Sequence, residues 1–333
     1  MKNILLLFGG ISNEHEISVM SASSIYKNIN KEKYNITTCY ISKENKWYKF
    51  DGDFDSLIKN DWIVNHEEDT IFNIIKYLQS FDLVFPILHG YGGEDGKIQG
   101  MLELFNIPFI GCNAISSNIG MDKITFKNIL SSAGLPTLPF VNINYDDYMI
   151  EDIIYNLDFP MIVKPSNGGS SIGITKVNTI KELDNAIKKA AIYDKYILIE
   201  PFINAQELEC AVIENDDIIV STIGEINAIN DFYDYEAKYE NNTVQTIIPA
   251  NIPDTVSEEI KTYAKKVFKL IRGRGLSRID FFYDTSSNKI YLNEINTIPG
   301  FTTISMYPKL FQHDGISYSK LLDILINNAI KKI

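Results

Sequence analysis

The strongest constraint on the fold is a pair of unbroken apolar runs that each lead into a glycine-rich segment. Residues 4–8 (Ile-Leu-Leu-Leu-Phe) precede Gly9-Gly10, and residues 84–88 (Val-Phe-Pro-Ile-Leu) precede a segment with four glycines in eight positions. A strand that is apolar on both faces is typical of a parallel sheet covered by helices. With further strands predicted at 34–41 and 81–86 and a helix at 17–29, residues 1–115 are expected to form an α/β layer.

The remaining elements are predicted from caps, turns and periodicity. A second unit is expected to begin near Asn118, where Asp122 can cap a helix that stops at Gly134, and Thr179 with Glu182 matches a capping box. Further strands are predicted at 161–164, 172–177, 196–200, 210–213, 218–223, 277–283 and 290–294, and helices at 260–271, ending at Arg272-Gly273, and at 317–330. Residues 45–70 are not assigned.

Composition and charge narrow the class of protein. The chain has 333 residues, 45% of them hydrophobic, enough for two or three globular domains. A net charge of -12 argues against a protein that wraps nucleic acid or coats an anionic membrane. Cys39, Cys112 and Cys210 lack metal or redox spacing and are expected to be reduced core residues. The apolar start is too short for a signal peptide, so a soluble cytoplasmic protein is expected.

A glycine- and serine-rich segment at 166–173 follows Lys164 and lies between two predicted strands. Glycines let backbone N–H groups turn toward an anion, and the lysine adds a positive charge for a phosphate. An ordinary hairpin loop is the plainer alternative. The segment lacks the Lys-Ser/Thr of a Walker A motif, but Gly-Ser-Ser-Ile-Gly matches a nucleophile elbow centred on Ser171, with His313 as a base. The strand predicted after Ser171 argues against that serine hydrolase, because an elbow requires a helix there.

Two strand-like segments carry carboxylates and an amide. Asp280 can face Glu294 on a neighbouring strand, and Glu294 and Asn296 point to the same side of theirs. Oxygen-only ligands of this kind suit Mg²⁺ or Mn²⁺ that bridges phosphates. The alternative is a set of ordinary surface acids, which the apolar flanking residues disfavour.

Three further segments have the composition of loops around a site. The first, 13–18, follows the first strand and contains Glu16, which could hold an ammonium group or simply favour the start of a helix. The second, 89–96, mixes glycines with charged and aromatic residues. The third, 231–239 (Asp-Phe-Tyr-Asp-Tyr-Glu-Ala-Lys-Tyr), is aromatic and charged without periodicity, as expected of a lid.

These segments, taken in order, resemble the D-alanine–D-alanine ligases of the ATP-grasp superfamily. The resemblance spans Gly9-Gly10 to Pro308 and includes Gly-Gly-Ile-Ser-Asn-Glu-His-Glu-Ile-Ser, His-Gly-Tyr-Gly-Gly-Glu-Asp-Gly, Tyr-Asp-Tyr-Glu-Ala-Lys-Tyr and Asn-Glu-Ile-Asn-Thr-Ile-Pro-Gly-Phe-Thr. It implies an α/β (α+β) ATP-grasp fold with an N-terminal substrate domain (1–115), a central domain (116–208) and a C-terminal catalytic domain (209–333), the last two clasping ATP. It also implies ligation of two D-alanines through an acyl phosphate, with two Mg²⁺ or Mn²⁺ ions, in a cytoplasmic homodimer.

The resemblance implies a role for each matching residue. The expected nucleotide contacts are Lys123, Lys164, Glu200, Glu207 and Lys238, and the expected metal ligands are Asp280, Glu294 and Asn296. Glu16, Ser170 and Tyr239 are expected to form a triad at the first D-alanine, His89 to lie beside that substrate, Arg278 and the Gly300 N–H to stabilise an oxyanion, and Ser305 and Met306 to flank the second substrate.

Two alternatives within this fold stay open. One is a ligase that makes D-alanyl-D-serine or D-alanyl-D-lactate, and the other is a non-catalytic nucleotide-binding module. Met306 and the lid pair Lys238-Tyr239 favour D-alanine as the second substrate, and the full set of lysines and metal ligands favours an enzyme.

Overall fold

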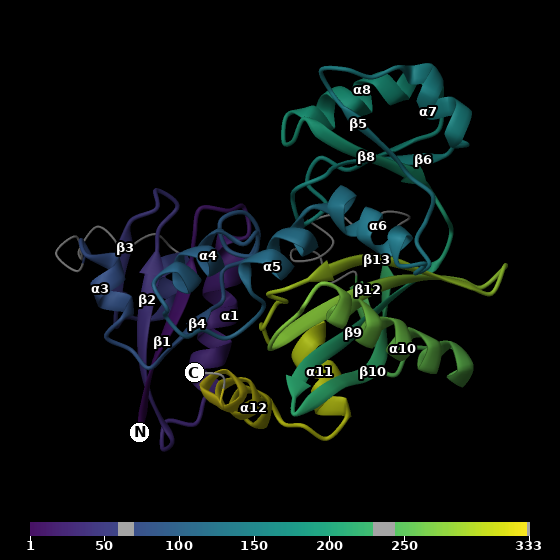
Figure 1. Cartoon of the computed structure of the whole chain (residues 1–333). Coiled ribbons are helices and arrows are strands. Elements are labelled where there is room, and N and C mark those ends of the chain that lie inside the picture. Colours follow the sequence, from purple (N-terminus) through teal and green to yellow (C-terminus); the bar gives the residue numbers. More distant parts are fainter. Residues whose placement is uncertain (59–69, 229–243, 332–333) are drawn as a thin grey trace.

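The computed structural model describes residues 1–58, 70–228 and 244–331, which form three sheets with helices around them (Figure 1). The first sheet has the order β3-β2-β1-β4, the second β5-β8-β6-β7, and the third β11-β10-β9-β12-β13. The strands are β1 (Lys2–Gly9), β2 (Tyr34–Ile41), β3 (Trp47–Phe50), β4 (Leu83–Pro86), β5 (Val141–Asn144), β6 (Met161–Pro165), β7 (Thr175–Val177), β8 (Tyr196–Pro201), β9 (Gln206–Asn215), β10 (Asp217–Ala228), β11 (Val244–Ile247), β12 (Leu276–Asp284) and β13 (Lys289–Asn296).

The helices are distributed around these sheets. They are α1 (His15–Asn28), α2 (Phe54–Ile58), α3 (Ile74–Leu78), α4 (Lys97–Leu104), α5 (Ala114–Met121), α6 (Lys123–Ser132), α7 (Ile150–Asn156), α8 (Ile180–Ala191), α10 (Asp254–Leu270), α11 (Met306–His313) and α12 (Tyr318–Lys331). In Figure 1, α12 runs back from the third sheet toward α1 and the first sheet. Within the described residues, none of the helices combines the length and apolar character needed to cross a bilayer.

The first sheet follows from the unbroken apolar runs. β1 pairs in parallel with both β2 and β4, and its residues from Ile4 onward are buried because neighbouring elements cover both faces. The predicted α/β layer is therefore confirmed, and β3 and α2 now account for part of the unassigned 45–70 stretch. The cysteines are free and buried, as expected.

Of the two helix caps predicted around the second sheet, one is confirmed and the other differs in detail. Asp122 caps α6 by accepting the Thr125 N–H at 2.7 Å. The capping box before α8 is wrong in detail, because Thr179 makes no side-chain cap and Glu182 accepts the Asn178 N–H at 2.8 Å. The strand predicted at 172–177 shortens to β7.

One predicted domain boundary differs from the structure. The predicted division between 208 and 209 falls inside β9, so we propose that the central unit ends before Gln206. The helix α10 ends just before Arg272-Gly273, as predicted, and Arg272 there adopts the left-handed region (φ 58). The other divisions of the three-domain scheme remain a proposal.

Candidate active site

A cleft of about 570 Å³ brings the predicted site segments together. Its lining includes Glu14 and His89 from the first sheet's loops, the Gly/Ser segment, the end of β8, and residues of β12 and β13. Such a volume is within the range of small-molecule sites. Because the lining comes from all three sheets, the cleft exists only once these units pack together.

Glu14, and not Glu16, faces this cleft. Ser170 donates a hydrogen bond from Oγ to Glu14 Oε1 at 2.6 Å, which joins the segment after β1 to the Gly/Ser segment. Glu16 instead lies at the surface and forms a 2.5 Å ion pair with Lys43. The prediction for Glu16 is therefore wrong, because two residues along a helix turn a side chain by about 200°. Either acid of the Glu-His-Glu sequence could have been chosen from the pattern alone.

Two glycines lie close to the Glu14 carboxylate. A Cβ on Gly169 would lie 2.8 Å from Glu14 Oε2, and one on Gly90 would lie 2.6 Å from the same atom. Glu14 also occupies the N-cap position of α1 without capping the helix with its side chain. The carboxylate is therefore held in the cleft by close packing of three segments.

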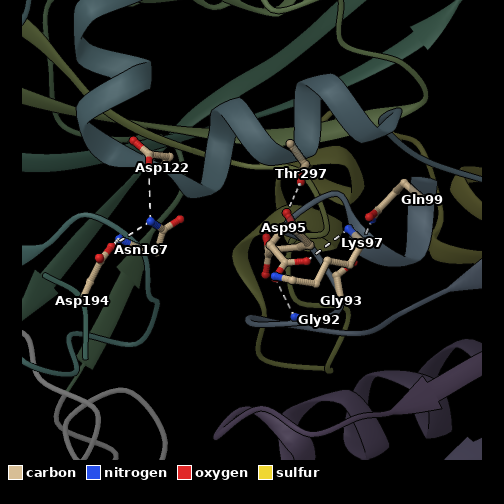
Figure 2. A network of polar contacts seen from close by, with 10 residues as sticks. Gly92, Gly93, Asp95, Lys97, Gln99, Asp122, Asn167, Asp194 and Thr297 are labelled. Atoms are coloured by element: carbon tan, nitrogen blue, oxygen red, sulfur yellow. Dashed lines mark hydrogen bonds and ion pairs between the residues drawn. The ribbon is translucent and has the colours of Figure 1, made fainter. Parts of the chain in front are cut away.

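Lys123 and the Gly/Ser segment are fixed to each other. Lys123 Nζ donates to the Gly168 carbonyl at 2.6 Å, and its pKa is lowered by burial although Glu294 opposes that effect. Figure 2 shows Asn167 between two acids, with its side chain donating to Asp122 at 3.2 Å and to Asp194 at 2.8 Å. The start of the Gly/Ser segment is thereby anchored to the cap of α6, next to Lys123.

Lys164 lies in a buried three-charge cluster that sequence reasoning only partly found. Glu200 forms 2.5 Å ion pairs with both Lys164 and Lys127. Burial opposes the ionisation of Glu200, but the two lysines outweigh it and lower its pKa to about 2. Lys127 was missed because a single lysine among the apolar residues of α6 gives no signal of its partner.

The expected metal set lies around Arg278. Asp280 is paired in register with Glu294, as the sequence suggested, and Arg278 is paired with Asn296. Arg278 donates two hydrogen bonds to Asp280, at 2.7 and 2.5 Å, and forms a 3.2 Å ion pair with Glu209. Burial alone would lower the pKa of Arg278, but these two carboxylates raise it well above its ordinary value.

The oxygen donors of this set fit a hard divalent cation. Asp280, Glu294 and Asn296 offer two carboxylates and an amide from adjacent strands, and Asn296 already donates to Asp280 at 3.1 Å. Mg²⁺ favours carboxylate ligands together with substrate phosphates. Among the described residues, no group of three His, Cys, Asp or Glu side chains could hold a metal without such help.

His89 lines the cleft, but both of its ring nitrogens already contact the protein. Nδ1 lies 2.9 Å from the Ile298 carbonyl oxygen and Nε2 lies 3.1 Å from Ser21 Oγ. The nearby Glu94, which sequence reasoning did not single out, accepts from the Gly90 N–H at 2.9 Å. Burial, reinforced by Glu14, raises the pKa of Glu94 to about 8.

The two residues expected beside the second substrate do not line the cleft. Ser305 instead accepts a 3.0 Å hydrogen bond from the Thr302 N–H and packs next to Gly300, which does line it. Met306 is buried in the hydrophobic core, where its sulfur would lie 2.7 Å from a Cβ placed on Gly224. Met306 lies outside the residues that line this cleft, and its role beside the second substrate stays a prediction.

The remaining predicted residues include one that lines the cleft and several that lie outside the described residues. Glu207 lines the cleft as expected. Lys238, Tyr239 and the predicted lid at 231–239 lie outside the described residues. The serine-hydrolase alternative is wrong, because Ser171 is followed by β7 and no helix, and the exposed His313 does not line the cleft.

Comparison with known proteins covers almost the whole chain. The family models described as D-ala D-ala ligase N-terminus and C-terminus match residues 3–112 and 129–327. The D-alanine–D-alanine ligase of Acetivibrio thermocellus is 42% identical over 99% of this chain and 96% of its own length. The D-alanine–D-alanine ligase B of Clostridium tetani is 44% identical over 98% and 93%.

Solved structures agree with these sequence matches. The VanG D-Ala:D-Ser ligase from Enterococcus faecalis superposes with a TM-score of 0.89 at 36% identity, covering 98% of this chain and 99% of that one. The D-alanine-D-alanine ligase from Coxiella burnetii gives a TM-score of 0.87 at 34% identity, covering 99% and 94%. The expected α+β ATP-grasp fold is confirmed. The chain therefore belongs to the D-alanine–D-alanine ligase family.

Proposed function

We propose that this chain uses ATP to join two D-alanines into D-alanyl-D-alanine, a peptidoglycan precursor. The carrying observation is that one cleft is lined by Lys123, Lys164, Arg278 and Glu14 together. The lysines suit the phosphates of a nucleotide, and the Glu14 carboxylate suits the ammonium group of an amino acid. A site for nucleotide alone would need no carboxylate hydrogen-bonded to the Gly/Ser segment.

The reaction proceeds in two balanced steps. A carboxylate oxygen of the first D-alanine attacks the γ-phosphorus of ATP, and the bond to the β-phosphate oxygen breaks to release ADP. The amine of the second D-alanine then attacks the acyl carbon, loses a proton and expels phosphate. Negative charge develops on the carbonyl oxygen in the second step, where Arg278 and the Gly300 N–H act as donors.

Cation binding is assigned to Asp280, Glu294 and Asn296. Bound Mg²⁺ or Mn²⁺ would neutralise charge on the transferred phosphoryl group. In the described structure Asp280 is held by Arg278 and Asn296, so its carboxylate is already fixed in the cleft. We also expect a cytoplasmic homodimer, as the resemblance implies.

D-Alanine is proposed as the second substrate. The curated relatives, at 42% and 44% identity, are named D-alanine–D-alanine ligases, whereas the D-Ala:D-Ser ligase structure is 36% identical. That structural match keeps D-serine as the second candidate. A pocket rarely excludes one added hydroxyl strongly, so competition between the substrates is the decisive measurement.

A phosphate-release assay with product identification tests the proposal. With ATP, Mg²⁺ and D-alanine, we expect ADP, phosphate and D-alanyl-D-alanine. Glu14→Gln should raise the KM for D-alanine by about tenfold to a hundredfold, since a charge-assisted hydrogen bond is worth about 1.5–3 kcal/mol. Glu16→Gln is the matched control and should behave as wild type. AMP formation, or phosphate release that ignores D-alanine, would refute the reaction.

A further inference from the structure

A buried hydrogen-bonded chain connects α1 and the segment after β4 to residues 298–301. His89 Nδ1 lies 2.9 Å from the Ile298 carbonyl oxygen, which can only accept, so Nδ1 carries the proton. Burial lowers the pKa of His89, which favours the neutral ring. Nε2 is then an acceptor, and it lies 3.1 Å from the hydroxyl of Ser21.

The same series of hydrogen bonds also reaches the other end of residues 298–301. Ser21 Oγ accepts the Phe301 N–H at 3.2 Å while donating its own proton to His89. Glu94 adds a longer contact, 3.4 Å, to the Ile298 N–H. Ser21 is fully buried and does not line the cleft. Contacts from outside the segment therefore fix the residues on either side of Pro299-Gly300.

Both enclosed residues, Pro299 and Gly300, reach the cleft. A Cβ on Gly300 would lie 2.7 Å from Ser305 Oγ. A small shift of this backbone would redirect the Gly300 N–H. Donors aimed in advance at a developing charge are effective because no reorganisation is needed during reaction.

We propose that Ser21 and His89 are positioning residues that aim the Gly300 N–H into the cleft. The inference rests on the proposed function and deepens it, because His89 then acts through the backbone and not by holding the first substrate. Ser21 does not line the cleft and is not expected to touch substrate. Replacing Ser21 therefore tests the positioning role of His89 separately from a direct contact between His89 and substrate. Misplacement of a reacting group by about 1 Å can cost on the order of a hundredfold in rate.

The test compares Ser21→Ala, His89→Asn and the double variant with wild type. Ser21→Ala should lower kcat about tenfold to a hundredfold and weaken binding of a phosphinate dipeptide mimic similarly, with ADP affinity unchanged. His89→Asn can keep a donor for Ile298 but loses the acceptor for Ser21. Because both residues act through one series of hydrogen bonds, the kcat of the double variant should be no lower than that of the less active single variant.

Ser221→Ala is the matched control. Ser221 is also fully buried, accepts one backbone N–H, from Ala211 at 2.9 Å, and donates one hydrogen bond, to Thr222 at 2.7 Å. It should lose comparable stability and keep kcat. Additive losses in the double variant, or a Ser21→Ala effect confined to KM or ADP affinity, would overturn the proposal.

Amide exchange provides a readout that does not depend on activity. The Phe301 and Gly300 amides should exchange faster in Ser21→Ala than in wild type, and equal to wild type in Ser221→Ala. Unchanged exchange in Ser21→Ala would overturn the positioning role even if the wild-type enzyme forms D-alanyl-D-alanine. A wild-type protein that forms no dipeptide would instead refute the proposed function.

Discussion

Replacing Lys127 by methionine tests the buried charge cluster behind the cleft. The side chains of Lys127 and Glu200 are 1% and 3% exposed and form a 2.5 Å ion pair, with Lys164 as the second partner of Glu200. Methionine has a similar length and keeps the apolar packing. The substitution therefore removes one buried charge and leaves Glu200 with a single partner.

The expected loss can be worked out from the Glu200 pKa. Each unit by which folding lowers a pKa corresponds to about 1.4 kcal/mol of stability. Lowering the pKa of Glu200 from 4.5 to about 2 therefore corresponds to roughly 3 kcal/mol at neutral pH. This stability is present above pH 4.5 and is lost as pH falls toward 2. Burial lowers the pKa of Lys127 despite Glu200, so the intact pair gains less than its rupture costs.

Urea unfolding at pH 7 measures the effect. Lys127→Met should lower the free energy of unfolding by about 3 kcal/mol, the lower end for a broken buried pair, because Lys164 remains. Adding Glu200→Gln should restore part of that loss. Lys188→Met is the control, since its 2.6 Å pair with Asp184 is exposed to solvent and should contribute little to stability. A Lys127→Met loss below about 1 kcal/mol, or a double variant less stable than Lys127→Met, would refute the reasoning.

Three further outcomes are expected. Glu294→Gln should keep the wild-type melting temperature and lose on the order of a hundredfold in kcat, because a neutral amide would not balance the charge of a divalent cation bound there. Near wild-type turnover would disprove the metal assignment. With equimolar D-alanine, D-serine and D-lactate, D-alanyl-D-alanine should dominate the products, and a predominant mixed dipeptide or depsipeptide would contradict this. Folding raises the pKa of Glu94 from 4.5 to about 8, so this residue should make the free energy of unfolding fall as pH rises across that interval, by up to about 1.4 kcal/mol per pH unit. Glu94→Gln should flatten this slope, and an unchanged slope would argue against a protonated Glu94.

Local sequence signals predicted most of the individual elements. The unbroken apolar run of β1 gave a buried parallel strand, and Asp122 gave the start of α6. The two-residue period of strands also predicted that Glu294 and Asn296 point to the same side of β13. These features depend on residues close together in the chain or on a simple alternation, so a sequence encodes them directly.

Packing decided which side chains share the cleft. Both acids of the Glu-His-Glu sequence suit an ammonium group, but only Glu14 meets Ser170, because the Gly/Ser segment approaches that side of α1. Lys127 carries no local mark of its partner Glu200, and the burial of Met306 against Gly224 is invisible in its motif. The amino-acid sequence by itself determined the elements and the kinds of chemical group present. Only the tertiary structure decided their partners, because a side chain's neighbours depend on how distant segments cross.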